Sequence, residues 1–212
     1  MSPVEVTQAG HHRSMLIGLA LLFFAPLALA FLLYYGLHWR PGGQLNHGDL
    51  VQPPLPLPDL ALHRVEAAAA PDAVPGAADA LTAPDFLKGK WTLLYFGPGS
   101  CPAACRADLY DTRQVRTALG KDESRVQRVF LAEGACCDLT LLRTLHPDLV
   151  TVRVTDEAAP LVTLLRQARP GARDRIYVID PLGNLMMSYA ADAPAKGMLE
   201  DLKRLLGLSH VG

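Results

Sequence analysis

The clearest hydrophobic pattern in the sequence is one long apolar run near its start. Over residues 14–37 no side chain is charged. A helix needs about 20 apolar residues to cross the hydrocarbon core of a bilayer, so this run is long enough to span one. Tyr34, Tyr35 and Trp39 gather at its far end, as aromatic residues do at a membrane interface. The pattern predicts a transmembrane helix over residues 14–37, in contact with membrane lipid.

A cleaved signal peptide is the alternative for this run. Signal peptides have an apolar core of roughly 7–15 residues and a small-residue cleavage site. The run here is longer, and bulky residues follow Ala28 and Ala30, so an uncleaved anchor is favoured. The short head, residues 1–13, favours a cytoplasmic amino terminus. We therefore expect a single-pass protein of a bacterial inner membrane, with its domain facing the periplasm.

Residues 38–87 show no regular alternation of apolar and polar positions. They are rich in Pro, Ala and Gly, and the segment QPPLPLPDLAL cannot form a helix because each proline removes a donor and fixes φ. Such a composition predicts an extended tether and domain entry. The low-complexity stretch that ends it, AAAAPDAVPGAADALTAPDF, is either a loop or a poorly paired hairpin.

Regular structure is predicted over residues 88–212. Short apolar runs predict strands, and longer amphipathic segments predict helices. The expected strands are WTLLYF, RVQRVFLAE, LVTVRV, IYVID and LMMSY, and the expected helices cover about 103–119, 139–145, 158–168 and 195–206. Their order, strand–helix three times and then strand–strand–helix, predicts an α/β sheet with helices on both faces. This is the order of a thioredoxin-like fold with one extra strand.

Length, composition and charge limit the classes of function that this chain can have. The length of 212 residues allows one anchor and one domain of ordinary size. The net charge of -1 lacks the basic excess that is typical of nucleic-acid binders, so no nucleic-acid partner is expected. A hydrophobic content of 50% fits a chain that lies partly in lipid.

The candidate chemistry centres on Cys101 and Cys105. They are the first and last residues of the segment CPAAC, which follows the first strand of the domain. Backbone amides and the dipole at the start of a helix favour a thiolate. Two thiols four residues apart lie on one helix face. Such a pair can form a disulfide, reduce another disulfide or bind a soft ion such as Cu(I); two buried structural cysteines are the alternative. Cys101 is the candidate nucleophile and Cys105 its resolving partner.

Cys136 and Cys137 follow the second strand of the domain. If the sheet is parallel there, their loop leaves the same carboxyl edge as the CPAAC loop. One hypothesis makes either of them a resolving thiol for the first pair. The alternative is that they are two small residues of a loop.

The chain resembles the Sco/SenC family of cytochrome c oxidase assembly proteins. The matching segments, over roughly residues 88–189, are GKWTLLYFGPGSCPAACRADL, VQRVFLAEG, LHPDLVTVRVTD and IYVIDPLGNLMMSY. The resemblance implies a thioredoxin-like domain on one membrane helix. It also implies that Cys101 and Cys105 are redox groups and copper ligands, and that the partners are a cytochrome oxidase subunit or other assembly factors.

The chain departs from the family at the third copper ligand, a histidine. Its place is taken by Ala172, and no histidine occurs between His146 and His210. The cis-proline of ordinary thioredoxins is also missing, since its place is near Asp174. We therefore expect thiol-disulfide exchange at Cys101 and Cys105, with Cu(I) handling as a secondary role. The alternative is a non-catalytic Sco-like scaffold that binds other assembly proteins.

Overall fold

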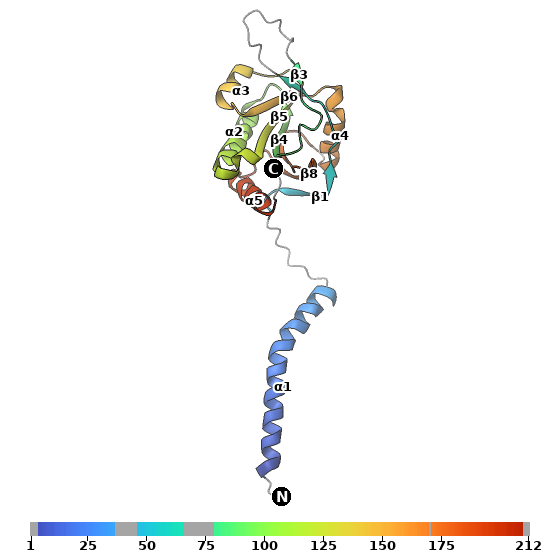
Figure 1. Cartoon of the computed structure of the whole chain (residues 1–212), viewed down its shortest axis with the longest axis vertical. Coiled ribbons are helices and arrows are strands. Elements are labelled where there is room, and N and C mark those ends of the chain that lie inside the picture. Colours follow the sequence, from blue (N-terminus) through green and yellow to red (C-terminus); the bar gives the residue numbers. More distant parts are fainter. Residues whose placement is uncertain (1–3, 37–45, 66–78, 170, 210–212) are drawn as a thin grey trace, which may run out of the picture. The chain divides into compact units, whose positions relative to one another are not determined.

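The computed structural model describes residues 4–36, 46–65, 79–169 and 171–209. By its internal contacts the chain divides into two units, residues 1–45 and residues 46–212. Figure 1 shows the first as a helix and the second as a folded domain. Each unit is described by itself.

The first unit is one helix. α1 runs from Val4 to Phe31 and continues as a π-helix, η1, over Leu32–Gly36. Its segment Ser14–Gly36 has 23 residues and a mean hydropathy of 2.7, which makes it long and apolar enough to cross a membrane. The helix begins ten residues before this segment, and Pro26 lies inside it. Trp39 of the predicted aromatic belt lies outside the described residues.

The second unit is built on one sheet of eight strands in the order β1-β8-β7-β4-β5-β6-β2-β3. Central strand β4 pairs in parallel with β5, and β5 pairs in parallel with β6. β7 is antiparallel to β4 and forms a hairpin with β8. The strands are β1 (Asp49–Pro56), β2 (His63–Val65), β3 (Asp79–Leu81), β4 (Trp91–Pro98), β5 (Val126–Glu133), β6 (Leu149–Arg153), β7 (Arg175–Ile179) and β8 (Asn184–Ala190).

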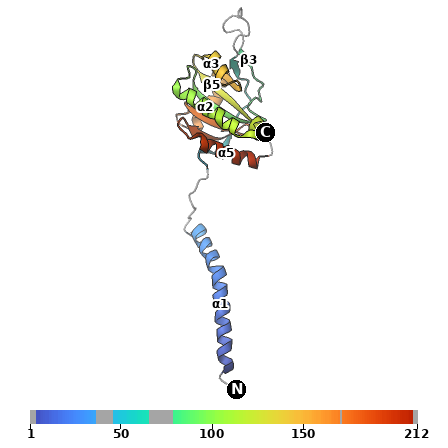
Figure 2. The same cartoon turned by 90° about the vertical axis from the view of Figure 1, so that its left-hand side faces the viewer.

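Helices cover both faces of this sheet, so the predicted α/β, thioredoxin-like architecture is confirmed. Figures 1 and 2 show α2, α3 and α5 over one face and α4 over the other. The helices are α2 (Ala103–Ala118), α3 (Leu139–Leu145), α4 (Ala159–Ala168) and α5 (Ala195–Leu208), with short 3₁₀ helices η2 (Gly120–Arg125) and η3 (Asp156–Ala158). The predicted order of strands and helices is found, and α5 ends two residues later than predicted.

Two apolar cores result, one on each face of the sheet. β4 contributes Leu93 and Tyr95 to the core beneath α2 and α5, and Leu94 and Phe96 to the core beneath α4. Successive side chains of a strand point to opposite faces, so an apolar residue at every position is needed where both faces are covered. This is why WTLLYF is continuously apolar rather than alternating.

The predicted tether is partly wrong, because the domain begins at residue 46 rather than residue 88. β1 adds to one sheet edge beside β8, and β2 adds to the other edge beside β6. Prolines are tolerated in β1 because it is an edge strand, and the pairing with β8 is irregular between Leu50 and Leu55. This part of the predicted tether is held in the core beneath α4 by buried Val51, Leu57 and Leu62.

A short hairpin involves the low-complexity stretch that follows residue 66. β2 and β3 pair antiparallel, with His63 opposite Leu81 and Val65 opposite Asp79. β2 precedes this stretch and β3 lies within it, so their pairing supports the hairpin among the two alternatives. Residues 66–78, between the two strands, lie outside the described residues.

Candidate functional site

The cysteine pair lies at the junction between the central strand and α2. β4 ends at Pro98, a turn follows, and the Cys101 amide donates to the Pro98 carbonyl at 3.0 Å. Pro102 is the N-cap of α2, so Cys105 lies in the first turn of the helix. Cys101 has a φ of 43°, in the left-handed region that few residues other than glycine adopt.

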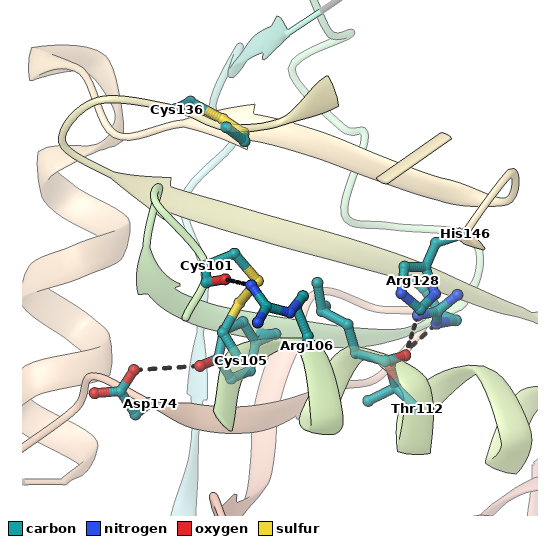
Figure 3. Close-up of a disulfide and its surroundings, with 11 residues drawn as sticks. Cys101, Cys105, Arg106, Thr112, Arg128, Cys136, His146 and Asp174 are labelled. Atoms are coloured by element: carbon teal, nitrogen blue, oxygen red, sulfur yellow. Dashed lines mark hydrogen bonds between the residues drawn. A yellow bond between two sulfur atoms is a disulfide. The ribbon is translucent and has the colours of Figure 1, made fainter. Parts of the chain in front are cut away.

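Cys101 and Cys105 are joined by a disulfide, with their Cα atoms 5.1 Å apart (Figure 3). The bond is buried: Cys101 is 6% exposed and Cys105 is 0% exposed. Cys101 is thus the more accessible of the two, as predicted for the nucleophile, but only by a small margin. Both belong to the apolar core beneath α2.

Arg106 lies beside the pair. Its guanidinium Nη1 donates to the Cys101 carbonyl at 3.1 Å, as Figure 3 shows. This hydrogen bond helps to hold the unusual backbone of Cys101. A positive charge at this place also favours a thiolate once the disulfide is reduced.

An acidic group on the same helix was not singled out from the sequence. Asp108 lies three residues after Cys105 and is 5% exposed, and its Oδ2 has no hydrogen-bond partner among the described residues. Burial, followed by the nearby Asp111, Asp174 and Asp192 carboxyls, raises the pKa of Asp108 to about 7. The spacing of three residues from Cys105 is the sequence signal that could have indicated it, because residues i and i+3 share a helix face.

Asp174 occupies the approach to β7, near the place of the cis-proline in ordinary thioredoxins. It has a φ of 56°, its amide donates to the Phe96 carbonyl at 2.8 Å, and its Oδ1 accepts from the Tyr95 hydroxyl at 3.2 Å. Burial and the Asp174 charge raise the pKa of Tyr95, so this hydroxyl remains a donor. The loop is therefore held against the central strand by hydrogen bonds rather than by a proline.

Cys136 and Cys137 lie in the loop after β5, where the parallel register predicted them. β4 and β5 end together, with Pro98 opposite Glu133, so both cysteine loops leave the same sheet edge. The two residues are joined by a second disulfide and are half-buried against the core that holds Cys101 and Cys105.

A buried arginine fastens α2 to the sheet behind the cysteines. Arg128 on β5 is 0% exposed; it donates to Thr112 Oγ1 at 3.1 Å, to the Leu109 carbonyl and to Asp148 Oδ1 at 3.0 Å. His146 packs beside it, and burial and the Arg128 charge lower the pKa of His146 to about 4. His146 is therefore neutral at pH 7 and serves this structural cluster.

Ala172 is the residue that the sequence resemblance places at the position of the Sco/SenC histidine ligand. Ala172 is 3% exposed, and its carbonyl accepts a hydrogen bond from the Tyr177 hydroxyl at 2.9 Å. Within the described ranges, no group of three or more His, Cys, Asp or Glu side chains is arranged to hold a metal ion. Reduced Cys101 and Cys105 would offer two sulfur ligands, a set that suits Cu(I).

Comparison with known proteins agrees with this architecture. Residues 91–209 match the family model described as "Transmembrane-like, thioredoxin-like, C-terminal domain". Comparison with curated proteins gives no match. Solved structures with similar folds include yeast Sco1 (TM-score 0.56, 18% identity, covering 74% of this chain and 97% of that one) and apo Sco1 from Thermus thermophilus (0.54, 21%, 76% and 96%).

A third similar structure is a thiol:disulfide interchange protein of the thioredoxin family from Chlorobium tepidum (TM-score 0.54, 19% identity, covering 73% of this chain and 97% of that one). At these identities the similarity establishes the fold alone. The thioredoxin-like fold predicted from the sequence is thereby confirmed, and its structural neighbours include the Sco proteins that the sequence resembles.

Proposed function

Because the chain belongs to the family of transmembrane-like, thioredoxin-like C-terminal domains, we propose that it is a membrane-anchored, Sco-like thiol-disulfide exchange protein. One observation carries the proposal: Cys101 and Cys105 form a disulfide between the central strand and the first turn of α2. A disulfide at the start of a helix is placed to release a thiolate that the backbone amides and the helix dipole stabilise.

The exchange begins with attack by a partner thiolate on Cys101 Sγ, the more exposed sulfur of the pair. The Cys101–Cys105 bond breaks, its electron pair goes to Cys105 Sγ, and a mixed disulfide joins Cys101 to the partner. A second partner thiolate then displaces Cys101. Overall, two electrons and two protons pass from the partner dithiol to the pair, and the reverse sequence reduces a partner disulfide.

The setting of this chemistry is proposed from the anchor and from the resemblance. The apolar segment Ser14–Gly36 fastens the chain to a bacterial inner membrane, with the domain in the periplasm, where disulfides persist. The Sco/SenC resemblance points to a cytochrome oxidase subunit, or another assembly factor for that oxidase, as the partner. The dithiol would keep the copper-site cysteines of such a subunit reduced.

Cu(I) handling by the same residues is part of the proposal, with copper as cargo. Reduction of the disulfide would free two soft thiolates, which can bind Cu(I) as a pair. Ala172, in place of the family's histidine, gives no third ligand at that position. Thiol-disulfide exchange is therefore the primary role, and copper transfer is secondary.

One observation favours the non-catalytic scaffold as the second candidate. The disulfide is almost completely buried, with Cys101 at 6% and Cys105 at 0% exposure, which is also typical of a structural cross-link. In that case the domain would bind assembly proteins through its surface, and the disulfide would only hold the start of α2 in place.

A trapping experiment separates the two candidates. Each variant, as reduced full-length protein in detergent, is mixed with an oxidised protein that carries a disulfide, and mixed disulfides are counted by non-reducing electrophoresis. The wild type is treated separately with a reduced protein dithiol. A Cys105→Ser variant should accumulate a mixed disulfide through Cys101, because the resolving thiol is gone, and a Cys101→Ser variant should accumulate far less. Equal, negligible trapping by both variants, with no reduction of the wild-type disulfide, would leave the scaffold.

A further inference from the structure

We propose that Cys136 and Cys137 are a second dithiol–disulfide pair, which faces solvent and exchanges electrons with the buried Cys101–Cys105 pair. This inference rests on the proposed exchange function and names the route by which a bulky partner reaches it. The Cys101–Cys105 disulfide is nearly inaccessible, whereas Cys136 and Cys137 are only partly buried against the same apolar core.

The two cysteine loops are in direct contact. The Gly99 amide, two residues before Cys101, donates to the Glu133 carbonyl at 2.8 Å. A Cβ on Gly99 would overlap the Ala135 carbonyl and lie 3.0 Å from the Cys136 Cα. A side chain other than hydrogen would therefore separate the loops, and glycine permits this close approach.

The loop that carries the second pair has a conformationally free glycine before its cysteines. Gly134 has a φ of 80°, and within the described ranges no atom beyond its own chain neighbours lies within 4 Å of the place where a Cβ would be. The segment from Gly134 to Cys137 belongs to no helix or strand, and Asp138 caps α3 directly after it. Figure 3 shows both disulfides at this end of the sheet. The proposed exchange uses rotation about Gly134 to bring Cys136 to Cys101, two residues from the Gly99 contact.

The exchange between the two pairs is balanced once a partner dithiol has supplied two electrons and two protons. A partner dithiol first reduces Cys136–Cys137. The thiolate of Cys136 then attacks Cys101 Sγ, the Cys101–Cys105 bond breaks, and its electron pair goes to Cys105. Cys137 attacks the Cys136 sulfur of the mixed disulfide, which restores the vicinal disulfide and releases the Cys101 thiolate. Two electrons and two protons have moved from the outer pair to the inner pair.

Trypsin separates the two pairs cleanly, which makes the exchange directly measurable. Cleavage after Lys90, Arg106, Arg128 and Arg143 leaves one pair in the peptide 91–106 and the other in the peptide 129–143. Each native disulfide is thus internal to one peptide. Only a bond between the pairs joins the two peptides under non-reducing conditions.

The first test uses full-length Cys105→Ser/Cys137→Ser protein in detergent, which retains Cys101 and Cys136. Mild oxidation should join the peptides 91–106 and 129–143 in a species of monomer mass. The matched control, Cys101→Ser/Cys137→Ser, retains the fully buried Cys105 and should form this link at least about tenfold more slowly, because exchange rates depend on access to the sulfur. Absence of the link in the first variant, or equal rates in both, would overturn the exchange between the pairs.

The second test measures the rate at which a reduced protein dithiol reduces Cys101–Cys105. In full-length Cys136→Ser/Cys137→Ser protein this rate should fall about tenfold, while reduction by dithiothreitol, which is small enough to reach the buried bond, keeps its rate. Unchanged rates with the protein dithiol would reject the relay and leave the proposed function standing. If neither reductant opens the wild-type Cys101–Cys105 bond, the proposed function itself fails, whatever the cross-linking gives.

Discussion

Between acid and neutral pH, the native domain should lose part of its free energy of unfolding as Asp108 is forced to ionise. The Asp108→Asn variant should not show this loss. The Asp108 carboxyl is 5% exposed, and no hydrogen-bond partner of its Oδ2 lies in the described part of the chain. Burial is the main reason that its pKa rises from 3.8 to about 7, and the neighbouring carboxyls of Asp111, Asp174 and Asp192 add to it. Asn keeps the shape of the side chain but cannot ionise.

The sign and size follow from proton linkage. Below pH 3.8, folded and unfolded chains both hold the proton on Asp108. Between pH 3.8 and about 7 the unfolded chain releases it while the folded chain keeps it, so the free energy of unfolding falls as pH rises. A difference of about three pH units, at about 1.4 kcal/mol per unit, gives a loss of about 4 kcal/mol that is complete above the folded pKa.

Urea unfolding of the full-length protein in detergent at pH 4 and at pH 8 measures this loss. From pH 4 to pH 8, the free energy of unfolding of the wild type should fall by about 4 kcal/mol relative to that of Asp108→Asn. The control Asp85→Asn removes an exposed carboxyl from a turn and should keep the wild-type dependence. Identical pH dependence in the wild type and Asp108→Asn would refute the reasoning.

Three further predictions concern the support of the site. Asp148→Asn leaves the fully buried Arg128 without its carboxylate and should lower the free energy of unfolding by about 3–5 kcal/mol in urea titrations; a change below 1 kcal/mol would contradict it. Gly99→Ala should cost about 1–3 kcal/mol of stability through overlap with the Ala135 carbonyl, and an unchanged melting temperature would count against the contact. Burial lowers the pKa of His146 to about 4, so the free energy of unfolding of the wild type should gain about 3 kcal/mol from this group between pH 4 and pH 6.5. The His146→Gln variant should lack this rise in urea titrations. A rise that persists in the variant would exclude His146 as its source.

The central strands and the cysteine pair were predictable because local sequence determines them. WTLLYF is apolar at every position, which is typical of a strand covered on both faces, and CPAAC follows it at the start of an amphipathic helix. The parallel register of β4 and β5 then brought Cys136 and Cys137 to the predicted sheet edge. These features depend on periodicity and on strand order, which one sequence can reveal.

The edge strand β1 and the acidic group beside the cysteines were not predictable in the same way. β1 contains three prolines, and only its position at the sheet edge, set by the distant β8, makes it a strand. The pKa of Asp108 depends on burial and on Asp174 and Asp192, which are far away in the sequence. The deep burial of Cys101 and Cys105 likewise results from tertiary packing rather than from the motif.

The most direct test of the account is a redox titration of Cys101–Cys105 in the full-length protein. Protein in detergent is equilibrated with graded ratios of reduced and oxidised dithiothreitol, and free thiols are then alkylated. After trypsin digestion, mass spectrometry of the peptide 91–106 gives the fraction that is reduced. A reversible two-electron transition is expected, in which ten-fold steps in the equilibrium constant correspond to about 30 mV. A disulfide that stays closed across the whole range, or that cannot be re-formed after reduction, would contradict it.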